Sequence, residues 1–111
     1  MEHGKIFQIT DIVEYIPNSI VIKSIIKNTT GNVNALSFDK DEILINKIIP
    51  FNTLIQIIKG DAEIIIDDTS YLIKTGQSII IPPHTRNTLK ANVRFKMLST
   101  IIKTGYEDLS L

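Results

Sequence analysis

The central part of the chain consists of short apolar runs separated by turn-forming residues. Four such runs follow one another at 54–59, 62–66, 71–74 and 78–81. Isoleucine dominates them, and short runs of β-branched residues between Gly, Asp and Pro are typical of β-strands. The pattern therefore predicts a series of strands, the last of which ends at Pro82 and Pro83.

The breaks between these runs predict the turns. Gly60 and Gly76 allow a positive φ at little steric cost where a turn needs one. The pair Asp67-Asp68 fits a tight hairpin turn, although it lacks the glycine typical of such turns. Strands joined by such short turns pair antiparallel, because parallel pairing needs a long crossover connection. Several of them in succession predict an all-β sandwich or barrel.

The flanking segments continue the strand pattern. Further strands are expected at 20–27, 33–38, 43–49 and 93–103. Within the last of these, simple alternation places Phe95 and Met97 on one face and Lys96 on the other. We therefore expect one continuous β-domain over residues 20–103.

The two ends of the chain differ from this pattern. Residues 1–19 form an entry arm, in which the segment 11–16 is either one helical turn capped by Asp11 or an edge strand. Residues 104–111 are expected to be a loose tail. The length of 111 residues is that of a single domain.

Two of the runs, 64–66 and 79–81, are isoleucine throughout and therefore apolar on both faces of a strand. An antiparallel sheet with one solvated face should instead alternate between apolar and polar residues. We therefore expect one outer face of the sheet to be covered, either by the arm or by a second subunit.

Charge and composition exclude several classes of partner. The 12 basic and 12 acidic residues give a formal net charge of zero, so a nucleic-acid partner is not expected. The absence of cysteine excludes disulfides and thiolate metal sites. No apolar stretch is long enough to span a membrane, and the first apolar run is soon broken by charge, unlike a signal peptide. We expect a cytoplasmic protein without a membrane partner.

The segment around Gly76 carries a resemblance to a known family. Gly76, Pro82 six residues later, and then Asn87 resemble the second motif of the cupin superfamily, G-x5-P-x-G-x2-H-x3-N. The segment that ends at Gly60 resembles the close of the first cupin motif, G-x5-H-x-H-x3-E-x6-G. The resemblance covers residues 31–103 and implies an all-β fold, the cupin double-stranded β-helix (a jelly-roll barrel), of the small single-domain bacterial type.

The chain departs from the family at every usual metal-ligand position. With Gly60 aligned, the two histidine positions of the first motif hold Lys47 and Ile49, and its glutamate position holds Thr53. The histidine position of the second motif holds Asn87. Divalent ions in proteins prefer His, carboxylate or thiolate donors, which this set does not offer. We therefore predict a cupin with no metal and no other cofactor.

The resemblance implies that these four positions meet inside the barrel. Lys47 could bind an anionic ligand, or act as a base or Schiff-base lysine if burial lowers its pKa. Alternatively, its stem lies on apolar neighbours and its ammonium group stays in water at the barrel mouth. Asn87 could bind the polar edge of a ligand or bond its own backbone. Thr53 and Ile49 are either pocket residues or ordinary strand residues.

Three further residues are candidates for the same pocket, and Arg86 is a candidate at its mouth. Met97 is expected to point inward from the last strand. Alternation from Thr53 places Gln56 on the opposite face, unless a bulge shifts it into the pocket. His84, in the loop Pro-Pro-His-Thr-Arg, is either a base or ligand at the barrel mouth or an exposed loop residue. Arg86 could bind a carboxylate there or simply be solvated.

Three functions remain open. The chain could bind a small organic ligand, anionic in one version, inside a metal-free barrel. It could be a small-molecule enzyme of the isomerase, lyase or dioxygenase type, although the missing ligands argue against a metal-dependent one. It could also be a structural or oligomerisation module with a barrel plugged by isoleucine. An open polar cavity would favour the first function, and a cavity with His84 or Lys47 aimed into it would favour the second. Cupins commonly dimerise through an outer face, so the resemblance also implies a homodimer.

Overall fold

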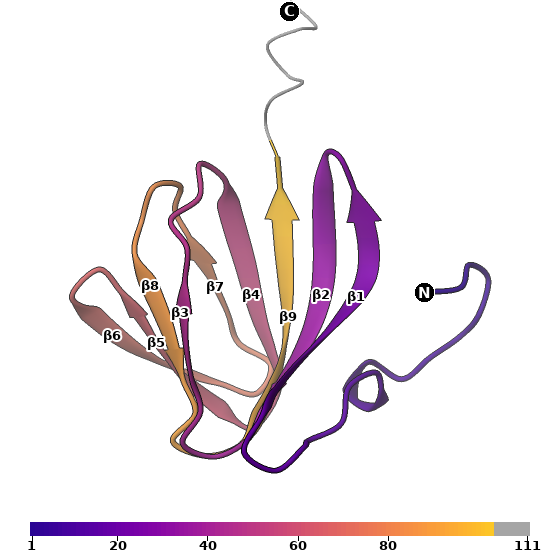
Figure 1. Cartoon of the computed structure of the whole chain (residues 1–111), viewed down its shortest axis with the longest axis horizontal. Coiled ribbons are helices and arrows are strands. Elements are labelled where there is room, and N and C mark those ends of the chain that lie inside the picture. Colours follow the sequence, from indigo (N-terminus) through magenta and orange to yellow (C-terminus); the bar gives the residue numbers. More distant parts are fainter. Residues whose placement is uncertain (104–111) are drawn as a thin grey trace, which may run out of the picture.

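Two antiparallel sheets make up almost all of the described structure, which is a computed structural model covering residues 1–103 (Figure 1). The larger sheet has the strand order β1-β2-β9-β4-β7 and the smaller one the order β3-β8-β5-β6. The strands are β1 Ile20–Asn28, β2 Gly31–Phe38, β3 Ile43–Asn46, β4 Asn52–Lys59, β5 Asp61–Ile66, β6 Thr69–Lys74, β7 Ser78–Ile81, β8 Asn87–Lys90 and β9 Phe95–Ile102. Within residues 1–103, no helix is long and apolar enough to cross a membrane. The predicted tail, 104–111, lies outside the described residues.

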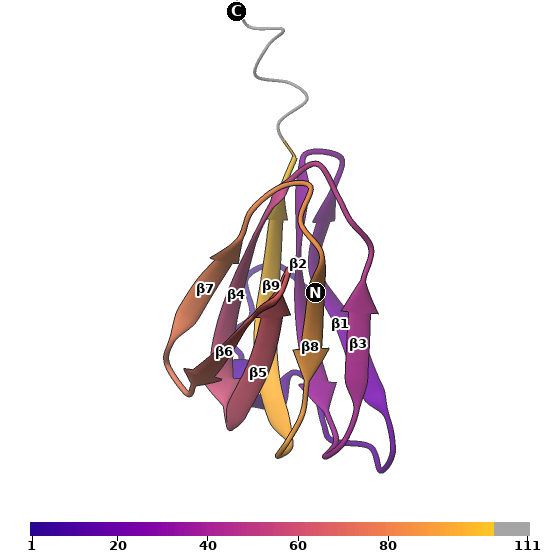
Figure 2. The same cartoon turned by 90° about the vertical axis from the view of Figure 1, so that its left-hand side faces the viewer.

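The two sheets face each other and enclose the core. They converge at one end and spread apart at the other, and Figure 2 shows the smaller sheet in front of the larger one. Phe38 and Phe95 stack at the converging end, with ring centroids 4.4 Å apart and an interplanar angle of 14°. The inward residues above them include Met97, Ile57 and Ile64, all of which are fully buried. The double-layered all-β fold expected from the sequence is thus confirmed.

The expected turns are present at the expected places. Gly60 and Gly76 have φ angles of 79° and 85°, as the connections before β5 and β7 require. The hairpin between β5 and β6 turns at Asp67 and Asp68, and Asp67 has a φ of 51°. Asp tolerates this left-handed conformation better than most residues with a side chain, so the turn forms without glycine.

The expected positions of one strand and of the helical turn were wrong. The strand expected at 43–49 ends at Asn46, because β8, its one partner within residues 1–103, pairs with it over Ile43–Asn46 and no further. Lys47 and Ile49 therefore lie in the connection between β3 and β4. The helical turn is a short 3₁₀ segment at Ile9–Asp11, earlier than the expected segment 11–16. The apolar residues that follow it pack on a sheet instead of continuing the helix.

The arm covers part of the outer face of the larger sheet. Ile12 and Val13 are buried against Ala35 of β2, and Leu98 of β9 packs against the same cluster. Lys96 lies beneath the arm, where its Nζ donates a hydrogen bond to the carbonyl oxygen of Thr10 at 2.6 Å. The arm is therefore one element that covers the outer face.

Candidate functional site

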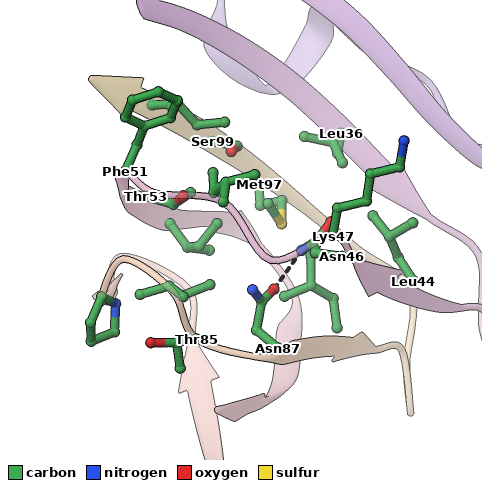
Figure 3. A pocket seen from close by; sticks show the side chains of 16 residues that line it. Leu36, Leu44, Asn46, Lys47, Phe51, Thr53, Thr85, Asn87, Met97 and Ser99 are labelled. Carbon is green, nitrogen blue, oxygen red and sulfur yellow. Dashed lines mark hydrogen bonds between the residues drawn. The ribbon is translucent and has the colours of Figure 1, made fainter. Parts of the chain in front are cut away.

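A cavity of about 290 Å³ lies between the two sheets near the end at which they spread apart (Figure 3). Its wall is mainly aliphatic, with a few hydroxyl and amide groups. The lining residues are Leu36, Leu44, Asn46, Lys47, Ile49, Phe51, Thr53, Ile55, Ile81, Pro82, Thr85, Asn87, Leu89, Met97, Ser99 and Ile101. The barrel interior is thus open at this end and packed only towards the phenylalanine pair.

The alternation of side chains along the strands builds this wall. On β4, Thr53 and Ile55 point inward, and their partners on β9 are Ile101 and Ser99. Every second residue of a strand lies on the same face, so the inward residues of paired strands form rows across the sheet. The smaller sheet contributes the facing wall in the same way, for example with Asn87.

Five of the seven pocket candidates line the cavity, including all four positions aligned with the cupin metal ligands. These five are Lys47, Ile49, Thr53, Asn87 and Met97. The positions brought together by the motif alignment thus also line one cavity in the structure. Within this group the lysine is different, because its side chain is exposed and extends away from Asn87 and the cavity (Figure 3). Its stem lies in the wall and its ammonium group lies in water, which is an arrangement common for lysine.

Two candidates lie elsewhere, and their inclusion in the pocket was wrong. Gln56 lies on the outer face of β4 and lines a separate shallow hollow with Ile9 and Ser78. The bulge that could have shifted its parity occurs later on β4, between Ile57 and Lys59. His84 is exposed in the loop between β7 and β8, where its N–H donates to the Ile49 carbonyl at 2.8 Å. His84 stands at the second glycine position of the cupin motif, and its φ of 59° is a conformation that glycine adopts at the least cost.

Sequence reasoning missed the residue that holds Asn87. Asn46 ends β3 directly opposite Asn87, and its Nδ2 donates a hydrogen bond of 2.6 Å to Asn87 Oδ1. Asn87 is only 7% exposed, so this bond lies largely out of solvent. The alternation of Leu44 and Asn46 could have placed Asn46 inward, but the pairing of β3 with β8 has no local signal in the sequence. Ser99 was also missed, although alternation from Met97 could have placed it inward, and Thr85 lies in a loop, where alternation does not apply.

The donor chemistry of the cavity does not fit a divalent metal ion. The four aligned positions supply an ammonium group, an alkyl group, a hydroxyl and an amide. The amide oxygen of Asn87 is already bonded to Asn46. Within residues 1–103, no group of three or more His, Cys, Asp or Glu side chains is arranged to hold a metal ion. The side chains present therefore offer no ligand set of the kind that binds zinc, iron or manganese.

A charged network lies near the start of β9, away from the cavity. The backbone N–H of Asn18 and the guanidinium group of Arg94 hold the pKa of the Asp39 carboxyl below its usual value. Partial burial raises the pKa of Tyr15, and the positive charge of Arg94 opposes this shift. The Arg94 guanidinium lies 4.6 Å from the centre of the Tyr15 ring. These contacts connect the arm to the barrel.

A second carboxylate is held on the outer face of the smaller sheet. Glu63 of β5 accepts hydrogen bonds from the Asn92 amide at 3.0 Å and from the Ser70 hydroxyl at 2.7 Å. These two donors lower the pKa of Glu63, with a smaller contribution from Lys90. Both the bonds and the charge lie on solvated surface, so they concern the exterior of the barrel and not the cavity.

Structures similar to this fold are known, although no family model matches the chain and no curated protein matches it. A conserved protein of unknown function from Streptococcus pyogenes is 26% identical, with a TM-score of 0.88 over 94% of this chain and 91% of the other. A cupin superfamily protein from Desulfitobacterium hafniense is 19% identical, with a TM-score of 0.87 over 94% of this chain and 95% of the other.

A third similar structure is a cupin 2 conserved barrel domain protein from Leptotrichia buccalis. It is 26% identical, with a TM-score of 0.84 over 87% of this chain, which spans only 47% of that protein. The structural similarity and the two-sheet topology agree with the resemblance of the sequence motifs. The chain therefore has the double-stranded β-helix fold of the cupin superfamily, without the histidines that bind metal in that family.

Proposed function

We propose that the chain binds a small organic molecule in the barrel cavity. The observation that supports this most directly is an open space of about 290 Å³ lined mainly by aliphatic side chains with a few polar groups. Ligand pockets in proteins have this character, in which an apolar wall supplies affinity and a few polar groups orient the ligand. An anionic group on the ligand would meet Lys47 only at the mouth, because the lysine is exposed.

The two alternative functions have less support. A plugged barrel would leave no such cavity, and Ile49 lines the space without filling it. A metal-free enzyme would need a base or nucleophile within reach of the bound molecule. His84 does not line the cavity, and the ammonium group of Lys47 extends away from it (Figure 3). The donor set also does not suit a metal-dependent enzyme.

The test is a pair of serine-to-leucine substitutions. Ser99 lines the cavity and Ser78 lies exposed on β7, so Ser99→Leu narrows the space and Ser78→Leu adds the same side chain outside. We would titrate a library of small aromatic and alicyclic molecules into labelled protein and follow the backbone amide signals by NMR. We expect the wild type and Ser78→Leu to bind library members through cavity-lining residues, and Ser99→Leu to lose this binding. Equal binding by all three proteins would place the ligand site elsewhere.

We also infer that the chain forms a homodimer through the outer face of the larger sheet. An unbroken row of side chains with apolar groups crosses all five strands beyond the part covered by the arm. It consists of Ile26, Val33, Thr100, Leu54 and Ile80, which pair in succession across β1, β2, β9, β4 and β7. Ile26 and Ile80 are 52% and 61% exposed, and a second copy of the chain would cover them.

A further inference from the structure

We infer that the cavity recognises its ligand through a neutral carbonyl oxygen, which accepts a hydrogen bond from the side-chain amide of Asn87. This inference rests on the proposed ligand-binding function and specifies the chemical class of the ligand. That class comprises small ketones, esters, lactones and amides with an otherwise apolar body.

In the described part of the chain, the side-chain amide of Asn87 is hydrogen-bonded at its oxygen and not at its nitrogen. Asn87 is more than nine-tenths buried, and its Oδ1 accepts a hydrogen bond from Asn46. Among residues 1–103, its Nδ2 donates to no protein acceptor, and this atom keeps some accessible surface. Figure 3 shows this amide among the apolar side chains of the cavity wall. An amide N–H without a protein acceptor beside an apolar cavity gains a hydrogen bond when a ligand supplies an acceptor there.

Asn46 holds the side-chain amide of Asn87 in a fixed direction. Asn46 and Asn87 are the last pair of the β3–β8 ladder, so the backbone holds their side chains next to each other. Asn46 donates to the oxygen of Asn87, and the NH₂ group of Asn87 keeps both of its N–H bonds for a ligand. The Thr85 hydroxyl, which also lines the cavity, already donates to the Pro83 carbonyl at 3.0 Å. The amide NH₂ is therefore a positioned donor, and its complement is an acceptor.

Among the described residues that line the cavity, no cationic group lies beside Asn87 to balance a charge on the ligand. Among residues 1–103, Lys47 is the only ionisable residue that lines the cavity, and its exposed side chain extends away from Asn87. A carboxylate placed beside Asn87 would lose its hydration without gaining a cationic partner, which is strongly unfavourable. A neutral carbonyl oxygen loses far less on entering the cavity, and one amide hydrogen bond offsets much of that loss. The inner end of the ligand is therefore neutral.

Three probes of matched size and shape separate these possibilities. Acetophenone carries the ketone, α-methylstyrene replaces its C=O by C=CH₂, and benzoate replaces the acetyl group by a carboxylate. Each is titrated into wild-type protein and two variants, with NMR detection of the backbone and side-chain amides. Asn87→Leu removes the proposed donor, and Gln56→Leu removes an amide from the outer face as the matched control.

We expect acetophenone to bind the wild type more tightly than benzoate and to shift the Asn87 side-chain NH₂ signals, which α-methylstyrene should leave in place. The affinity of the ketone relative to the alkene should fall by roughly threefold to tenfold in Asn87→Leu, the effect of one neutral hydrogen bond. The same ratio should be unchanged in Gln56→Leu. The NH₂ signals of the wild type decide the matter on their own if Asn87→Leu fails to fold.

The outcomes that would contradict the inference show whether the proposed function is overturned with it. If the probes shift cavity residues but benzoate binds best, or the Asn87 NH₂ signals respond equally to ketone and alkene, the inference is overturned and ligand binding stands. If none of the three probes shifts a cavity-lining residue at millimolar concentration, both the inference and the proposed function are overturned.

Discussion

The cavity shows how far single residues can change the chemistry of a site while its geometry is retained. Lys47, Ile49, Thr53 and Asn87 occupy the positions at which the cupin motifs carry metal ligands, and all four line the cavity. Their side chains supply one hydroxyl and one amide suited to neutral hydrogen bonding. The barrel thus keeps the place of the site and offers a different set of interactions there.

The glycines act at the same scale, and two of them make a sharp comparison. Gly60 and Gly76 both have a positive φ, but a Cβ at Gly60 would clash with the carbonyl oxygen of Arg94, whereas one at Gly76 has no heavy atom within 4 Å. We expect Gly76→Ala to lower the free energy of unfolding by about 1 kcal/mol through backbone strain alone. Gly60→Ala should lower it by about 3 kcal/mol or more, because the backbone before β9 must also move.

Urea unfolding followed by circular dichroism measures both variants. Equal losses of stability would mean that the close approach of Arg94 to Gly60 contributes nothing beyond the strain of a positive φ.

Among the elements, the arm has the clearest separate role. It covers the outer face of β2 and β9 with Ile12 and Val13, and it provides the carbonyl group of Thr10 that pairs with the buried Lys96. Without the arm, that ammonium group and the apolar surface of Ala35 would face water. The arm therefore stabilises the sheet that forms one wall of the cavity.

Two substitutions on the arm test this role. Ile12 is 8% exposed and Ile16 is 51% exposed, so truncation of the first removes packing and truncation of the second does not. We expect Ile12→Ala to lower the free energy of unfolding by about 2 kcal/mol and to speed hydrogen exchange in the arm. Ile16→Ala should stay within about 0.5 kcal/mol of the wild type. Similar exchange rates in both variants would show that the arm is held by other contacts.

For the molecule as a whole, the exposed apolar residues are distributed unevenly over its surface. The row that ends at Ile80 crosses the entire larger sheet, while Leu72 lies on the outer face of the smaller one. The two side chains are about equally exposed, at 61% and 58%. They therefore allow a matched test of which face joins two copies of the chain.

We expect the wild type to have the mass of a dimer in sedimentation equilibrium. Ile80→Lys should produce a monomer, because it would place a charge in the contact where no partner compensates it. Leu72→Lys should keep the mass of the dimer. A monomeric wild type would argue against the dimer altogether, and dissociation caused by Leu72→Lys alone would move the contact to the smaller sheet.

The sequence alone determined the all-β class, most strand positions, the turns at Gly60 and Asp67, and the loss of the metal-binding side chains. These features depend on local preferences and on side-chain chemistry, which neighbouring residues already specify. Only the tertiary structure decided that the barrel is open, that Asn46 holds Asn87, that no bulge turns Gln56 inward and that the arm buries Lys96. Each of these depends on which distant strands pair and in which register, and a one-residue difference in register would reverse every face.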